Sequence, residues 1–246
     1  MEDLINSLGL TEKCGAEEFK AGRIILFNKP FAWSSFDVVN KIRIQLRTHL
    51  GIRKIKVGHA GTLDPMATGL LIICTGKATK QIDNIIGADK EYVANISFGA
   101  TTPSYDLETE PDRLFDTTGI TTESIEKVLM NFLGFQMQAP PIFSAIKKDG
   151  KKSYEQARKG IEIELDKRKV EFKELELLEY NAPCAVVRIV CSKGTYIRSF
   201  AHDLGAAMGS GAHLSGLVRT AIGSLRIKDA MEIEQFENIL SEMSTI

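Results

Sequence analysis

Apolar residues recur along the chain with the period of a helix in some segments and that of a strand in others, and these two periods predict the main secondary-structure elements. Ser34 and Asp37 form a capping-box start and Gly51 a stop, so a helix is predicted between them. Its apolar positions recur every four residues: Val38, Ile42, Leu46 and Leu50. A second amphipathic helix, closed by Gly134, is predicted from apolar residues at helical spacing: Ile125, Val128, Leu129, Phe132 and Leu133. Further helices are predicted over 153–159, 200–208 and 234–240.

Strands are predicted where apolar residues run together or alternate with polar ones. The first covers 23–27 and leads into a loop through Asn28, Lys29 and Pro30. A buried strand follows over 68–75, and alternation over 92–98 places Tyr92 on the core side. Later strands are predicted over 170–178, 185–191 and 222–227, with a tight turn at Asp149 and Gly150. The simplest organisation is an N-terminal extension, 1–22, before a single domain, 23–246.

Composition narrows the class of protein without indicating a cofactor. A chain of 246 residues with 43% apolar content can bury a sizeable core. Its four cysteines form no CxxC pair and have no histidine at metal spacing, so neither a metal site nor a disulfide framework is indicated. No signal sequence or membrane-length apolar run is present, and a soluble, cytoplasmic protein is expected.

Charge is balanced overall but divided along the chain. The formal net charge is -1, yet residues 40–63 hold six Lys or Arg and no acid. A second basic stretch covers 147–159, while residues 104–126 hold seven acids against one arginine. Such clusters are either solvated surface or a local positive face for phosphate. Six residues are predicted to contact the RNA backbone: Lys29, Arg43, Arg47, Lys54, Lys147 and Lys148.

The segment 58–69, GHAGTLDPMATG, is here named the aspartate loop. Its three glycines and Pro65 exclude a helix or a central strand. Asp64 is the only carboxylate between Asp37 and Asp83. Asp64 either caps a turn ahead of Pro65 or is held in place for chemistry.

The aspartate loop resembles the catalytic motif of the TruB family of tRNA pseudouridine-55 synthases. Other segments are similar to that family in the same order, over roughly residues 22–227: LFNKP at 26–30, KEYVANISFG at 90–99, PPIFSAIKKDGKKSYEQARKG at 140–160, GTYIRSFAHDLG at 194–205 and GAHLSGLVRT at 211–220. The resemblance implies the pseudouridine synthase fold, an α+β fold with a mixed, largely antiparallel sheet flanked by helices and loops.

The resemblance also implies roles for individual residues. Asp64 matches the catalytic carboxylate, and Arg198 matches the arginine that pairs with it. Tyr92 matches the tyrosine that stacks on the target uracil, and His59 the histidine that fills the space left by the flipped base. Tyr196 and Leu217 match residues that line the uracil pocket. Each has a structural alternative: a hydrogen-bonded histidine, a phosphate-binding arginine, or ordinary packing of the aromatic and leucine side chains.

The implied partner is the T arm of tRNA, with no cofactor and no obligate protein partner. Two features depart from the family pattern. Ala60 stands after His59 where the family has threonine, and the chain stops where many members continue into a C-terminal PUA domain, which is therefore not expected here. His202 and His213 have only structural interpretations.

Other classes of function remain open at this point. Lys77 is followed by Ala78, so the segment 69–79 is not a Walker-type nucleotide loop. A tRNA-binding module without catalysis is one alternative. A retaining glycosidase that uses Asp64 with Asp106 or Glu108 is another. A guide-RNA-dependent relative of the dyskerin type is a third, which would be expected to carry the PUA domain.

Overall fold

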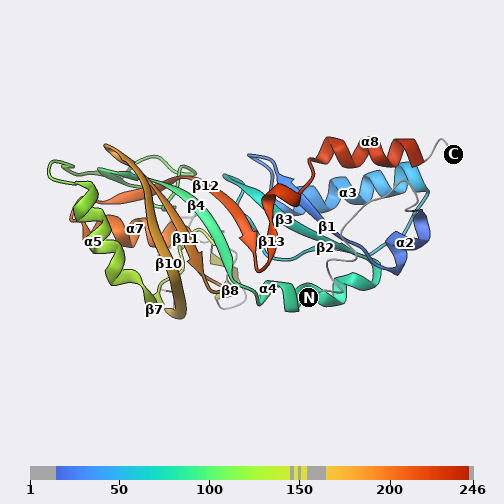
Figure 1. Cartoon of the computed structure of the whole chain (residues 1–246), viewed down its shortest axis with the longest axis horizontal. Helices are drawn as coiled ribbons and strands as arrows, with labels where there is room; N and C mark the ends of the chain where they lie inside the picture. Colours follow the sequence, from blue (N-terminus) through green and yellow to red (C-terminus); the bar gives the residue numbers. More distant parts are fainter. Residues whose placement is uncertain (1–14, 145–146, 149–150, 154–164, 244–246) are drawn as a thin grey trace. The chain divides into compact units, whose positions relative to one another are not determined.

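The computed structural model describes residues 15–144, 147–148, 151–153 and 165–243. The chain divides into two compact units (Figure 1). Unit 1 comprises Met1–Lys90 and Val218–Ile246, and unit 2 comprises Glu91–Leu217. In the described part of the chain, no helix has the length and apolar character that crossing a bilayer requires.

Unit 1 is built on the antiparallel pair β1 (Ile24–Lys29) and β3 (Ala67–Thr75). The end of β12 (Ala212–Ile222) follows next to β3, and two short strands extend the sheet: β2 (Val57–His59) on β3 and β13 (Leu225–Arg226) on β12. The helices are α2 (Ala16–Ala21), α3 (Ser35–Leu50), η1 (Gly76–Gln81), α4 (Ile82–Ile86), η2 (Ile227–Asp229) and α8 (Ile233–Met243).

Alternation along β1 produces two cores, one on each face of the sheet. Ile25 and Phe27 face the core that α3 and α8 cover, and these two helices lie side by side (Figure 1). Ile24 and Leu26 face a second core with Ile85 of α4. The first core contains three rings in edge-to-face contact, because Phe236 of α8 meets Phe19 of α2 and Phe27 of β1 with centroids 6.2 and 5.4 Å away and interplanar angles of 85° and 81°.

Unit 2 contains the start of β12, followed across the sheet by β4 (Lys90–Phe98), β11 (Cys184–Cys191), β10 (Arg168–Asn181) and β7 (Gly134–Gln138). Phe200 of α7 (Ile197–Ala207) packs on Phe172 of β10 and Phe132 of α5 (Thr122–Phe132), with centroids 5.0 and 5.3 Å away. Two small hairpins complete the unit: β5 (Ala100–Thr101) with β6 (Arg113–Leu114), and β8 (Lys147–Lys148) with β9 (Lys151–Lys152).

The predicted α+β class with a largely antiparallel sheet is confirmed. The helix after Ser34 is also confirmed, because Ser34 and Asp37 form a capping box and Gly51 ends α3 in the left-handed conformation, φ 65°. Tyr92 is buried on β4, as its alternation predicts. The turn at 149–150 and, after its first residue, the helix over 153–159 lie outside the described residues. The single domain beginning at residue 23 stays a prediction.

Some sequence predictions were wrong. Asn28 and Lys29 end β1 rather than forming a loop. The strand predicted over 222–227 is instead a β12–β13 hairpin, and β12 itself was missed because Gly216 interrupts its apolar pattern. A Cβ at Gly216 would lie 2.9 Å from the Asn95 side chain, so this glycine allows close strand packing. β7 was also missed; it begins at Gly134, which follows the C-cap Leu133 of α5 at φ 82° and so lies where the helix was predicted to end.

The edge-to-face contacts of Phe236 predict that α8 stabilises unit 1. Phe236→Ala removes a side chain with no solvent exposure and should lower the free energy of unfolding by about 3–5 kcal/mol. Urea unfolding of the purified protein measures this loss. Phe36→Ala is the matched control, because that ring is 58% exposed and its removal should change stability by less than about 0.5 kcal/mol. Equal effects at the two positions would contradict the packing described.

Candidate active site

The aspartate loop connects β2 to β3 in unit 1, and hydrogen bonds close it at both ends. The amide of Ala60 donates to the Ile72 carbonyl at 2.9 Å, and the amide of Ala67 donates to the Asp64 carbonyl at 3.0 Å. The second bond makes a turn that uses the backbone oxygen of Asp64. The Asp64 residue itself is half-buried.

The start of α3 holds the middle of the aspartate loop. The Ser35 hydroxyl accepts from the Leu63 amide at 2.8 Å and donates to the Leu63 carbonyl at 3.1 Å. The Ala32 amide donates to the Pro65 carbonyl at 3.0 Å. The backbone on both sides of Asp64 is thus held, by Ser35 at the start of α3 and by Ala32 in the turn before it.

Lys29 is a buried cation beside this carboxylate. Its ammonium donates to the carbonyls of Pro30 at 2.9 Å and Trp33 at 2.6 Å, with the Pro65 carbonyl at 3.4 Å. Burial lowers the pKa of Lys29 to about 8, against an opposing contribution from Asp64. The prediction that Lys29 contacts the RNA backbone was wrong, because its side chain has no solvent exposure.

Arg219 is a second buried cation in unit 1, and the sequence analysis gave it no role although it lies in the segment 211–220. Its Nε donates to the Leu70 carbonyl at 2.8 Å and its Nη2 to the Gly61 carbonyl at 3.0 Å. At Gly69 (φ 102°), a Cβ would lie 2.4 Å from the Arg219 carbonyl oxygen. β12 therefore approaches the aspartate loop so closely that only glycine fits there.

His59 ends β2 at the start of the aspartate loop. Its ring is half-buried, and its Nδ1 is buried with no hydrogen-bond partner among the described residues. Burial, with a smaller contribution from Arg219, lowers the pKa of His59, so the neutral ring predominates at neutral pH. The structural alternative for His59 required a hydrogen-bonded ring, and Nδ1 does not supply that bond.

Arg198 lies on the first turn of α7 in unit 2 and is 4% exposed. Its Nη1 donates to the Phe143 carbonyl at 2.9 Å and lies 3.3 Å from the Ser104 carbonyl. Its Nε lies 3.6 Å from the buried Asp106 carboxylate. Asp106, one of the two carboxylates that the glycosidase alternative could use with Asp64, is therefore an ion-pair partner of Arg198.

Tyr196 precedes α7 at its N-cap position and is half-buried. The Gln138 side chain accepts from the Tyr196 amide at 2.8 Å and donates to the Tyr196 carbonyl at 3.0 Å. Tyr92 lies on β4, and Leu217 is half-buried on β12. Sequence reasoning missed Gln138, since only the fold brings β7 to the start of α7.

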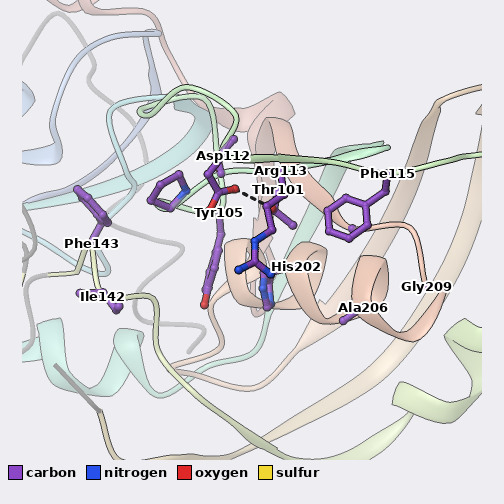
Figure 2. Close-up of a pocket in the computed structure, with 13 residues that line it drawn as sticks. Thr101, Tyr105, Asp112, Arg113, Phe115, Ile142, Phe143, His202, Ala206 and Gly209 are labelled. Atoms are coloured by element: carbon purple, nitrogen blue, oxygen red, sulfur yellow. Dashed lines mark hydrogen bonds between the residues drawn. The ribbon is translucent and has the colours of Figure 1, made fainter. Parts of the chain in front are cut away.

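A pocket of about 630 Å³ in unit 2 lies next to the Arg198 contacts (Figure 2). Tyr105 and His202 stack inside it with centroids 4.0 Å apart, and Phe143, whose carbonyl binds Arg198, forms another part of its wall. The structural interpretation of His202 stays a prediction. His213 lies with its Nδ1 3.0 Å from the Ala100 carbonyl.

The first basic cluster forms a surface pocket of about 500 Å³ in unit 1. Its cations come from α3 and from the segment before β2: Arg43, Arg47, Arg53, Lys54 and Lys56. Arg43 is partly committed to the fold, because its Nη2 donates to the Val57 carbonyl at 2.7 Å. Arg47 and Lys54 are exposed. Lys147 and Lys148 lie in β8.

The predicted site residues thus fall in both units. Unit 1 holds Asp64 and His59 together on the aspartate loop, whereas unit 2 holds Arg198 and the three residues assigned to the uracil pocket. The pairing of Arg198 with Asp64, which would join the two units, stays a prediction.

Solved structures first identify the class of fold. A chain of a Cbf5–Nop10–Gar1 complex is 25% identical, with a TM-score of 0.69 over 96% of this chain and 64% of that chain. A chain of an H/ACA RNP bound to a substrate RNA containing 2′-deoxyuridine is 26% identical, with a TM-score of 0.66 over 92% of this chain and 56% of that chain. This chain spans less than two thirds of either. The fold is that of the pseudouridine synthases.

Sequence relatives then identify the family. The model of the TruB family pseudouridylate synthase N-terminal domain matches residues 47–197, and the model of the tRNA pseudouridylate synthase B C-terminal domain matches residues 198–245. The tRNA pseudouridine synthase B of Phocaeicola vulgatus is 53% identical over 91% of this chain and 95% of the relative. The tRNA pseudouridine synthase B of Flavobacterium johnsoniae is 52% identical over 91% of this chain and 98% of the relative. The chain belongs to the TruB family.

The buried ammonium of Lys29 predicts a pH-dependent stability. Unfolded, the amine keeps its proton to about pH 10.5, and folded only to about pH 8. The cost of burying the charge is therefore complete below pH 8 and disappears as pH rises from 8 to 10.5. Lys29→Met lacks this titration, so the stability difference in favour of the wild type should grow across that interval. Urea unfolding of both proteins over the same pH range measures it, and a constant difference would contradict the assignment.

Proposed function

We propose that this chain is a tRNA pseudouridine-55 synthase that isomerises a uridine of the T loop, with Asp64 as its catalytic carboxylate. The observation that carries the proposal is the identity of more than 50% to tRNA pseudouridine synthase B enzymes over nine tenths of the chain. The reaction moves uracil from an N–C to a C–C bond with its ribose. It consumes no energy source and needs no redox partner.

A carboxylate at the sugar can begin this reaction in two ways. Asp64 either attacks the ribose covalently or removes a proton from it, and both routes require its ionised form. The attraction between the Lys29 ammonium and Asp64 favours the charged form of each. The hydrogen bonds from Ser35 and Ala32 support the proposal further, because they fix the backbone from which the carboxylate projects.

The remaining site residues receive roles around the flipped base. A uridine in a structured loop must leave its stack to reach Asp64. We assign Tyr92 to stacking on the uracil, Tyr196 and Leu217 to the walls of its pocket, and Arg198 to pairing with Asp64. His59 fills the space that the base leaves, a role that suits a neutral ring whose Nδ1 has no protein partner among the described residues.

A tRNA enzyme acting alone fits better than a guide-RNA-dependent one. The tRNA pseudouridine synthase B relatives are about twice as identical to this chain as the Cbf5 chain is. The chain also spans 95% of the first relative but only 64% of the Cbf5 chain. We therefore expect activity without a protein partner, in the cytoplasm, where tRNA is found.

Mapping pseudouridine in tRNA incubated with and without the purified protein tests the proposed function directly. Pseudouridine at position 55 only in the treated sample is the expected result. Binding without any product would favour a tRNA-binding module, the strongest alternative class. Release of sugar with no pseudouridine would favour glycosidase chemistry.

Asp64→Asn should abolish product while leaving tRNA affinity within a few fold, because the amide keeps the shape of the carboxylate and loses its charge and basicity. Single-turnover assays and filter binding measure the two effects separately. The matched control is Asp83→Asn, the same change at an exposed carboxylate of unit 1, which should keep full activity. Turnover by Asp64→Asn would reject Asp64 as the catalytic group.

The exposed cations of the basic cluster should control affinity rather than chemistry. Arg47→Glu and Lys54→Glu should weaken binding of full tRNA and of a T-arm hairpin alike, and reduce the slope of log affinity against log salt by about one for each phosphate that is no longer neutralised. The kcat at saturation should stay nearly unchanged. Lys228→Glu, at an exposed cation outside the cluster, is the control.

A preference for full tRNA over the hairpin of two or more orders of magnitude in kcat/KM would contradict recognition confined to the T arm.

A further inference from the structure

Arg168, the first residue of β10, has no role in the site described so far. Its guanidinium carbon lies 4.1 Å from the centre of the Tyr196 ring, a close cation–π contact. Its Nε is buried and has no hydrogen-bond partner among the described residues. An unpaired buried donor costs stability, so the position of Arg168 is not explained by its hydrogen bonds alone.

The strand partner of Arg168 holds the backbone of the same tyrosine. In the ladder between β7 and β10, Arg168 lies opposite Gln138. Gln138 bonds both the amide and the carbonyl of Tyr196. The two residues of this cross-strand pair thus both contact Tyr196: Gln138 bonds its backbone, and Arg168 packs on its ring.

This double contact restricts how the ring can turn. With the backbone fixed by Gln138, the Tyr196 ring can change orientation only about its side-chain bonds. Such a rotation would break the contact with Arg168, whose guanidinium is partly desolvated and whose Nε is buried. Arg168 therefore covers one face of the Tyr196 ring.

Lys169, the next residue of β10, also makes a cation–π contact, but with a ring that has no assigned role in the site. Lys169 Nζ lies 3.9 Å from the centre of the Phe135 ring, which is 63% exposed. Alternation along the strand directs consecutive side chains to opposite faces of the sheet. The two cation–π contacts are therefore adjacent in sequence, and only one of them holds a residue assigned to the uracil pocket.

We propose that Arg168 is a positioning residue for the reaction, whose guanidinium fixes the ring of Tyr196 against the target uracil. The inference rests on the proposed function, because it takes Tyr196 as part of the uracil pocket. A planar guanidinium stacks flat on an aromatic ring, whereas an ammonium acts as a point charge. Lysine should therefore replace Arg168 only in part.

A double-mutant cycle of Arg168→Met and Tyr196→Leu tests the proposal with the full-length protein and a T-arm hairpin. Arg168→Met should lower kcat about tenfold, the size expected when a desolvated cation–π contact is removed, and leave KM within about threefold. Arg168→Lys should recover part of the activity. If Arg168 acts through the ring, the double variant should be no slower than Tyr196→Leu alone.

Lys169→Met is the matched control, since it removes the neighbouring cation–π contact and should leave kcat unchanged. Additive losses in the cycle, or an Arg168→Met enzyme as fast as the wild type, would overturn the inference. Urea unfolding of each variant checks that it is folded, and Arg168→Lys keeps the test decisive if Arg168→Met is not. A wild-type protein that forms no pseudouridine would instead reject the proposed function.

Discussion

Two buried cations hold the aspartate loop, because a segment rich in glycine has few side chains with which to hold itself. Lys29 donates to the Pro30 and Trp33 carbonyls of the β1–α3 connection and lies 3.4 Å from the Pro65 carbonyl of the loop. Arg219 donates to the carbonyl of Gly61 in the loop and to that of Leu70, which follows it. Burying a charge is costly unless its donors find acceptors, and an irregular loop offers carbonyls that no strand or helix has used. The loop carbonyls satisfy part of the hydrogen bonding of the two cations, and the cations in turn hold the loop backbone.

This dependence also explains the glycine at 69. Arg219 reaches the carbonyls of Gly61 and Leu70 only because β12 lies directly against the start of β3. A side chain at Gly69 would collide with the backbone of Arg219 and push the strand away. The composition that identifies the loop in the sequence is therefore the composition that the close approach of a strand requires.

Local patterns predicted the elements that local forces determine. The capping box of α3, the buried run of β3 and the inward side of Tyr92 each depend on residues within a few positions. The supports of the site depend on contacts between distant segments, so they could not be predicted. Arg219 is 158 residues from Gly61, and Gln138 is 58 from Tyr196. Lys29 was misassigned because a lysine after an apolar run is usually exposed, and only the fold shows that carbonyls surround it.

The candidate site therefore separates two kinds of cation that the sequence alone does not distinguish. Lys29 and Arg219 are buried and bond backbone carbonyls, whereas Arg47 and Lys54 are exposed in a basic pocket. Mobile ions screen exposed charges within about a Debye length of 8–10 Å and affect buried ones much less. Raising the salt concentration should therefore weaken the attraction between the exposed cations and RNA phosphates, and leave the structure of the aspartate loop unchanged. Because the same protein contains both sets, the salt dependence of kcat compared with that of KM separates the residues that position the chemistry from those that attract the RNA.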